Sequence, residues 1–284
     1  MKKLSICLTH DVDRVRKTYH YLTHDLRRGR FRNLAEWFRQ GDPYWNFEKI
    51  MSLEDRYGAR STWFFLEESI PFQPLRPKTW KLSLGRYSVR EKAIAEIMRS
   101  MDGDGFEVGL HGSYRSFRDG ALLKHEKNII EGVLEKPIFG VRQHYLNLDV
   151  PDTWRLQREA GLKYDASYGY RRGLGWRRNR LEPFLDDTSG LWVLPLTIME
   201  CNLFTEAAGD PERAWEVALE IMDQAEEQKA VLSVLWHPHV YSEADFPGYG
   251  DVYEKILKEG KARGAEFLTA GEIVARRAVR VESN

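Results

Sequence analysis

Four short polar segments, each directly after an apolar run, carry the residues that could do chemistry. They are Thr9-His10-Asp11-Val12-Asp13, His111-Gly112-Ser113-Tyr114-Arg115, Arg142-Gln143-His144-Tyr145 and His237-Pro238-His239. If each apolar run is a strand of one parallel sheet, these carboxylates and imidazoles gather on one rim although they lie far apart in sequence. Such a group suits zinc or a similar divalent ion, which lowers the pKa of a bound water to about 7.

The first segment holds two carboxylates, Asp11 and Asp13, at positions i and i+2. They point to the same side if the chain stays extended, so one can bind a cation while the other accepts a proton. Taken alone, an Asp-x-Asp at a strand end also suits a turn or a helix cap, and a lone His111 is more often structural than a ligand. The four segments together favour metal binding over these structural interpretations.

Short β-branched and aromatic runs alternate with longer helical patterns, which indicates βα units around a parallel sheet. The expected strands are Lys3–Leu8, Arg60–Leu66, Glu107–Leu110, Ile138–Val141, Lys163–Asp165, Leu191–Leu196, Val231–Leu235 and Glu266–Thr269. The expected helices are Asn46–Tyr57, Val89–Met101, Ala121–Leu134, Pro151–Ala160, Pro211–Gln228 and Val252–Arg263. Helix starts are marked at Asp210-Pro211 and Asp149-Val150-Pro151, and helix ends at Gly58, Gly161 and Gly264.

Seven or eight such units that close on themselves predict a single α/β domain over residues 1–284, an irregular (β/α)7-8 barrel. An open, doubly wound sheet is the structural alternative. A basic and aromatic insertion at about residues 14–45 separates the first strand from its helix. It suits either a cover over the barrel mouth or a solvated capping loop.

Composition narrows the class of protein further. The 284 residues are 42% hydrophobic and 30% charged, as in an ordinary soluble globular protein, and the formal net charge is zero, so no global field attracts nucleic acid or membrane. P-loop, dinucleotide-binding and Gly-x-Ser-x-Gly motifs are absent from the sequence. Two cysteines, Cys7 and Cys201, exclude a disulfide framework. The first apolar stretch stops at Thr9, too early for a signal peptide, and no later stretch would span a membrane, so we expect a cytoplasmic protein.

The order and spacing of five fragments resemble the polysaccharide deacetylases, the chitooligosaccharide deacetylase-like domains of carbohydrate esterase family four. The similarity runs from the first strand to the last quarter of the chain. Five motifs carry it. The first is the first polar segment, in the variant form in which two acids flank a hydrophobic residue, and the second is a Thr-x-Phe-Phe strand. The motif of the metal-binding histidine, an Arg-x-Pro-Tyr-like motif and a final Leu-x-His follow in that order. The fragments are Thr9–Asp13, Ser61–Phe65, Glu107–Ser113, Gly140–Tyr145 and Leu235–His237.

The resemblance implies a role for each matching position. Asp11 is expected to be the general base, and Asp13 and His111 are expected to be ligands of a divalent metal ion, zinc. Arg142 is expected to pair with Asp11 and keep it ionised. His237 is expected to be the general acid, since an amine leaves poorly unless it is protonated. The metal ion would polarise the acyl carbonyl and stabilise the oxyanion.

Two positions depart from the family pattern. The second histidine of the metal motif is replaced by Arg115, so the usual ligand set is incomplete. His144 stands where the third motif has proline, two residues beyond Arg142, and two residues along an extended strand end share a side. We therefore predict His144 as the replacement ligand. The alternatives are a His144 that contacts substrate, or a site of weakened metal affinity.

Other polar residues leave several interpretations open. The nearest match to the fourth motif is Leu194–Glu200, where Glu200 could orient His237, meet the substrate or be a structural acid. His239 could exchange roles with His237, but the Leu-x-His spacing favours His237. The remaining histidines are expected at the surface or behind the site: His10, His20, His24 and His125.

The predicted function is hydrolysis of an N-acyl group, acetyl or formyl, on an amino sugar. The arginine-rich segment Arg171–Arg180 could bind phosphate through its guanidinium groups, which suits a nucleotide- or lipid-linked glycan precursor, although a solvated charged loop is the simpler interpretation. One alternative is an amidase that acts on a non-sugar amide or a cyclic ureide. Another is a barrel that binds glycan without catalysis. No nucleic-acid partner is expected.

Overall fold

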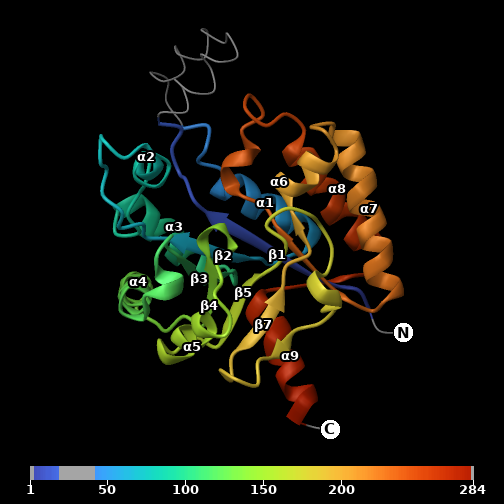
Figure 1. Ribbon diagram of the computed structural model, residues 1–284. Helices are drawn as coiled ribbons and strands as arrows, with labels where there is room; N and C mark the ends of the chain where they lie inside the picture. The colour runs from blue at the N-terminus through green and yellow to red at the C-terminus, as the bar shows by residue number, and fades with distance from the viewer. Residues whose placement is uncertain (1–2, 19–41, 283–284) are drawn as a thin grey trace.

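The computed structural model describes residues 3–18 and 42–282. A curled sheet lies at the centre, with helices packed around its outside (Figure 1). The strands are β1 (Ser5–Val12), β2 (Thr62–Leu66), β3 (Glu107–Gly112), β4 (Gly140–Gln143), β5 (Tyr164–Tyr168), β6 (Phe184–Leu185), β7 (Trp192–Pro195), β8 (Ile198–Met199), β9 (Val231–Leu235) and β10 (Glu266–Leu268). The helices are α1 (Phe47–Tyr57), α2 (Pro77–Ser83), α3 (Lys92–Gly103), α4 (Gly120–Leu134), α5 (Asp152–Glu159), α6 (Glu200–Glu206), α7 (Pro211–Glu227), α8 (Tyr249–Ala262) and α9 (Ala270–Glu282).

The strands follow the order β6-β7-β5-β4-β3-β2-β1-β9-β8, and β10 pairs with the first half of β1. Only the pair β6–β7 is antiparallel among the described strands. The edge strands of this order are β6 and β8, and no hydrogen-bonded pair of the described strands joins them, so the curled sheet stays open there. The predicted irregular α/β barrel is confirmed. Its parallel strands bring their carboxyl ends to one rim, as the sequence analysis required.

Every strand and helix expected from the sequence is present, with ends displaced by a few residues. Asp210 begins α7 as expected, because its carboxylate accepts the Glu212 N–H. Gly58 ends α1 in the left-handed conformation that only glycine adopts without strain. Among the described residues, three helices and two short strands were not expected from the sequence: α2, α6, α9, β6 and β8.

The core has two main parts. The larger one lies between the sheet and the outer helices, where α3, for example, buries Ile94, Ile97, Met98 and Met101 at helical spacing. The smaller one lies inside the curled sheet and joins inward side chains such as Cys7 to Ile273 and Val274 of α9.

Helix α9 closes the amino-terminal end of the barrel. The backbone N–H groups of Ala270 and Gly271 donate to Thr62 and Glu107, which are the first residues of β2 and β3. Figure 1 shows α9 below the sheet. The opposite rim, where the polar segments lie, is therefore the open end.

Most of the predicted insertion at 14–45 lies outside the described residues. At its start, Lys17 donates to Asp245 over 2.8 Å in a buried pair, so this end is joined to the segment before α8. No described helix combines the length and the apolar composition needed to cross a bilayer.

Candidate active site

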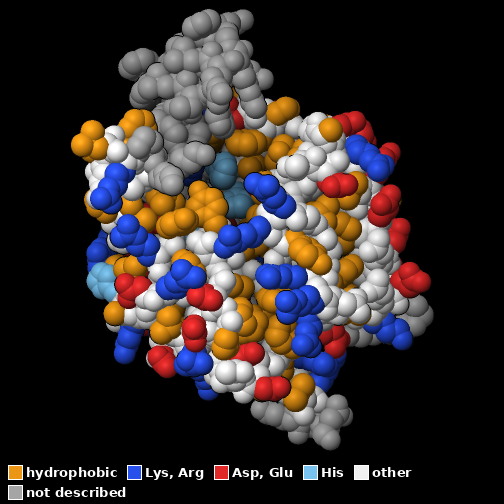
Figure 2. Space-filling view, viewed as in Figure 1, with side chains coloured by type: hydrophobic (Ala, Val, Ile, Leu, Met, Phe, Trp, Pro, Cys, Tyr) orange, Lys and Arg blue, Asp and Glu red, His pale blue; other side chains and the backbone are white. Residues whose placement is uncertain are grey.

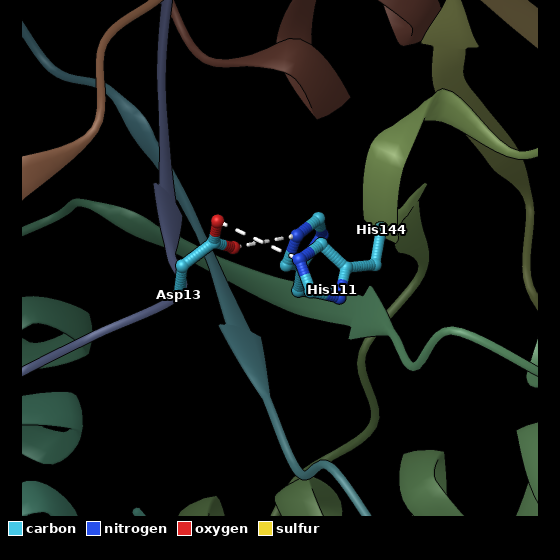
Figure 3. Close-up of side chains that lie close together, drawn as sticks. All are labelled: Asp13, His111 and His144. Carbon is cyan, nitrogen blue, oxygen red and sulfur yellow. Dashed lines mark ion pairs between the residues drawn. The ribbon is translucent and has the colours of Figure 1, made fainter. Parts of the chain in front are cut away.

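Three side chains from the carboxyl ends of β1, β3 and β4 converge on the open rim (Figure 3). Asp13 directly follows β1, His111 lies in β3, and His144 directly follows β4. One ligand atom of each lies within 4.8 Å of the others. The Asp13 carboxylate is 3.0 Å from Nε2 of His111 and 3.6 Å from Nε2 of His144. The chain thus brings one carboxylate and two imidazoles to a single point.

The donor atoms of this group fit a divalent metal ion. Oδ1 of Asp13 and Nε2 of His111 are buried, and neither has a hydrogen-bond partner within the described residues although they lie 3.0 Å apart. Buried polar atoms are rarely left unpaired, and these two face a common centre. Carboxylate oxygen and imidazole nitrogen are ligands that zinc accepts, with at least one position left for water or substrate.

The charges of the group reinforce one another. Burial raises the pKa of Asp13, but the imidazoles of His144, His111 and His237 outweigh it and hold that pKa well below its usual value. Burial lowers the pKa of His111, and the carboxylates of Asp11 and Asp13 raise it further than burial lowers it. The site therefore favours an ionised Asp13, the form that binds a cation.

The ring of His111 is fixed from behind. Its Nδ1 lies 2.8 Å from the carbonyl oxygen of Arg142 and donates to it, so Nε2 is the ring nitrogen that faces Asp13. A histidine that binds metal commonly has its other nitrogen held in this way.

His144 reaches the group by a different backbone path from the expected one. Strand β4 ends at Gln143, and His144 begins a turn of 3₁₀ helix rather than continuing an extended strand. The ring of Tyr145 stacks on it at 4.3 Å. Nδ1 of His144 lies 4.0 Å from the buried carboxylate of Glu68, which follows β2. His144 therefore reaches the side predicted for it, the one it shares with Arg142, through this turn and not along an extended strand.

Asp11 is paired with Arg142 inside the barrel. The guanidinium is fully buried, and its Nη1 donates to Oδ1 of Asp11 over 2.9 Å and to the Thr9 hydroxyl over 2.7 Å. Its Nε donates to the carbonyl of Ala166, and its plane lies over the Phe64 ring at 4.7 Å. Such bonds hold the carboxylate in one orientation. The other oxygen of Asp11 is 3.8 Å from Nε2 of His111, beside the metal-ligand group.

His237 and Glu200 form the opposite wall of the site. Nδ1 of His237, just after β9, lies 2.5 Å from the Glu200 carboxylate at the start of α6. Nε2 of His237 is 3.6 Å from Asp13. Burial lowers the pKa of His237, but the Glu200 carboxylate outweighs it and raises that pKa to about 10. The imidazole is therefore protonated near neutral pH and able to donate a proton into the site. Glu200, left open by the sequence, pairs with His237.

The other polar residues noted in the sequence take separate places. Arg115 is exposed and lines the cavity above the metal-ligand group without joining it. His239 packs beside His237, with ring centroids 5.5 Å apart. His10 is not at the surface: it is fully buried and bonds to the Glu54 carboxylate and the Trp236 carbonyl, both at 2.7 Å. His125 is exposed, as expected, and His20 and His24 lie outside the described residues.

Two buried acids near the site, Glu68 and Glu126, were not expected from the sequence. Glu68 accepts the backbone N–H groups of Ile70 and Tyr114 and faces His144. Glu126 of α4 accepts the backbone N–H of Ser113 over 3.1 Å. Both support the loops that carry the imidazoles. The only sequence signal was the position of Glu68 two residues beyond a strand end.

A cavity of about 1030 Å³ opens over the site. Figure 2 shows a histidine at the bottom of a hollow, among hydrophobic and basic side chains. Its walls include Ile70, Leu146 and Phe246. Of the segment Arg171–Arg180, Arg171 lines this cavity, whereas the arginines near its end line a separate groove beside Phe184: Arg177, Arg178 and Arg180.

No protein-family model matches the sequence, and none of the curated proteins matches it. Solved structures do match. A protein from Mycobacterium smegmatis, assigned as a polysaccharide deacetylase, superposes with a TM-score of 0.62 at 16% identity, over 98% of this chain and 92% of that one.

Two further structures match across nearly all of this chain. The peptidoglycan deacetylase PdaC from Bacillus subtilis has a TM-score of 0.52 at 13% identity, over 99% of this chain and 95% of its own. A pseudoenzyme of family CE4 from Bacillus anthracis has a TM-score of 0.51 at 10% identity, over 96% of this chain and 66% of its own. The fold is thus common to active and inactive proteins. The chain has the fold of the polysaccharide deacetylases of carbohydrate esterase family four.

Proposed function

We propose that this protein is a metal-dependent hydrolase that removes an N-acyl group, acetyl or formyl, from an amino sugar. The observation that carries the proposal is the convergence of Asp13, His111 and His144, with two of their facing donor atoms buried and unpaired within the described residues. Asp11 and His237 lie on two sides of that group. The proteins of similar fold whose names describe deacetylases support a sugar amide as the bond.

In this proposal Asp13, His111 and His144 hold a divalent ion, zinc by the chemistry of the donors. The ion would activate water and polarise the acyl carbonyl. Asp11, oriented by Arg142, takes a proton from the attacking water as the C–O bond forms.

His237 completes the reaction in this proposal. Its Nε2 proton passes to the amide nitrogen as the C–N bond breaks, so that a neutral amine and a carboxylic acid leave. Asp11 then releases the proton that it took from water, and His237 regains one from solvent. Glu200 orients the ring through Nδ1 and stabilises its charged form.

Metal content and turnover test the proposal together. Protein purified without chelator should contain about one divalent ion per chain and release acetate or formate from N-acyl amino sugars. His111→Ala should lose the ion, whereas His125→Ala, which changes an exposed imidazole of α4, should keep it. Asp11→Asn should keep the ion and lose turnover. Full activity of Asp11→Asn would refute the assigned base.

Two alternatives are separated by the same measurements. An amidase of non-sugar substrates would open ring amides or cyclic ureides and leave N-acyl sugars intact. A glycan-binding barrel without catalysis would bind sugar and release no acid, and the pseudoenzyme of similar fold makes this comparison necessary. Replacement of the usual histidine by Arg115 is the feature that favours it, and a stoichiometric ion with turnover would exclude it. The cytoplasmic location stays a prediction from the sequence.

A further inference from the structure

Three arginines stand around the cavity above the metal-ligand group. Arg76 directly precedes α2, Arg115 lies three residues after β3, and Arg171 lies three residues after β5. They come from three different loops at the carboxyl ends of strands, where barrel proteins carry their substrate contacts. In Figure 2 basic side chains border the hollow that contains the histidine.

Within the described residues these guanidinium groups form no ion pair. The lining carboxylates face other groups: Asp11 pairs with Arg142, Glu200 pairs with His237, and Asp13 faces the imidazoles of the metal-ligand group. Arg171 donates to the amide oxygen of Asn147, which also lines the cavity; this uses one of its five donor N–H groups and fixes its direction. The rim is thus locally positive, although the formal net charge of the chain is zero.

The size and lining of the cavity also suit a ligand larger than one sugar. Its volume of about 1030 Å³ lies at the upper end of the range for pockets that enclose drug-sized ligands, which leaves room beyond one acylated sugar. Tyr114 and Tyr145 are 42% and 52% exposed at this end of the barrel. Ile70, Leu82 and Phe246 add apolar wall. A ligand with both an anionic and an apolar part would contact all these groups.

We propose that the substrate is a phosphorylated amino sugar, a phosphate ester or diphosphate, whose phosphate binds Arg76, Arg115 and Arg171 while its acyl amide faces Asp13 and the imidazoles. Guanidinium groups bind phosphate oxygens in pairs of hydrogen bonds, and several positive charges match a phosphate dianion or diphosphate better than a single carboxylate. The inference rests on the proposed function. It also gives the substitution at position 115 a role, because Arg115 supplies substrate charge where the family has a metal ligand.

Binding without turnover tests this inference separately from catalysis. The probes are N-acetylglucosamine 1-phosphate and methyl N-acetylglucosaminide, which share the sugar and differ in the phosphate. Calorimetry on the metal-loaded Asp11→Asn protein, which should bind the probes without hydrolysing them, should give at least about tenfold tighter binding of the phosphate, with an affinity that falls as salt rises. Arg115→Ala and Arg171→Ala should each weaken the binding of the phosphate probe by about tenfold.

Arg172→Ala is the matched control, because Arg172 is exposed beside Arg171 and does not line the cavity. This variant should bind both probes as the unchanged protein does, and all the variants should keep their metal content. Equal affinity for both probes would overturn the inference, as would an equal loss in all three variants. Arginine-dependent phosphate binding, with no acetate release by the protein that retains Asp11, would support phosphate recognition while the proposed hydrolysis fails.

Two larger probes assign the source of the phosphate. If a uridine diphosphate-linked N-acetylglucosamine binds tighter than the 1-phosphate, the apolar wall binds a nucleoside. A geranyl diphosphate-linked sugar that binds tighter assigns it to a lipid chain. Either result supports the shared chemistry.

Discussion

The carboxylate of Glu126 is buried beneath the loop that follows the His111 strand, where it is 1% exposed. One oxygen accepts the Ser113 N–H over 3.1 Å, and the other has no hydrogen-bond partner within the described residues. Burial raises the pKa of this group to about 7, against the opposing effect of the Ser113 bonds. The native protein therefore prefers Glu126 protonated, whereas the unfolded chain ionises it near pH 4.5.

The sign of the pH effect follows from proton binding. Between pH 4.5 and about 7 the native state holds a proton that the unfolded state has lost, so the contribution of Glu126 to stability is present below pH 4.5 and is lost as pH rises through about 7. Since each pKa unit corresponds to about 1.4 kcal/mol, the loss is about 3 kcal/mol. Glu126→Gln keeps an acceptor for the Ser113 N–H and removes the titration.

We therefore expect Glu126→Gln to gain stability relative to the unchanged protein by about 3 kcal/mol between pH 4.5 and pH 7.5. Urea denaturation at several pH values, with chelator in every sample, measures the difference. Glu159→Gln, an exposed change on α5, is the control and should give a difference independent of pH. A pH-independent difference for Glu126→Gln, or the same rise in the control, would refute this account.

Three further substitutions test the packing around the site. Gly109→Ala should lower the free energy of unfolding by about 1–3 kcal/mol, because the added Cβ would lie 2.7 Å from the Phe64 ring, and thermal unfolding measures this loss. The same change should lower any turnover, measured as acid release, because that ring supports Arg142. Gly132→Ala, on α4 with nothing within 4 Å, should instead stabilise the fold by about 0.5–1 kcal/mol in the same unfolding assay. Arg142→Ala should cost about 3–5 kcal/mol by leaving the Asp11 carboxylate buried and unpaired, and the double variant with Asp11→Asn should recover part of that loss in denaturant titrations.

The elements that follow the periodicity of the sequence most strongly could be predicted from it. Helix α9 could not, because it begins directly after β10 and its apolar residues include the β-branched Ile273 and Val274, which have only modest helix propensity. Packing inside the barrel stabilises this helix, and such contacts are not visible in local sequence. The two-residue strands β6 and β8 are too short to give any pattern.

Of the site, only the residues at the ends of predictable strands could be predicted from the sequence. Asp13 and His111 follow from the rule that functional groups gather where parallel strands end. His144 was identified by its position, but its turn geometry was not. Glu68 and Glu126 look like ordinary surface acids in the sequence, and only the tertiary structure shows that they are buried.

One residue of strand β4, Arg142, positions two side chains of the rim. The carbonyl of Arg142 holds the ring of His111, and its guanidinium holds Asp11. A slip of β4 by one residue against β3 would therefore remove both bonds at once. Efforts to redirect this barrel to other ligands should leave β4 untouched and vary the exposed arginines Arg115 and Arg171 in the loops after β3 and β5, while Glu68 is kept because it holds the Tyr114 backbone.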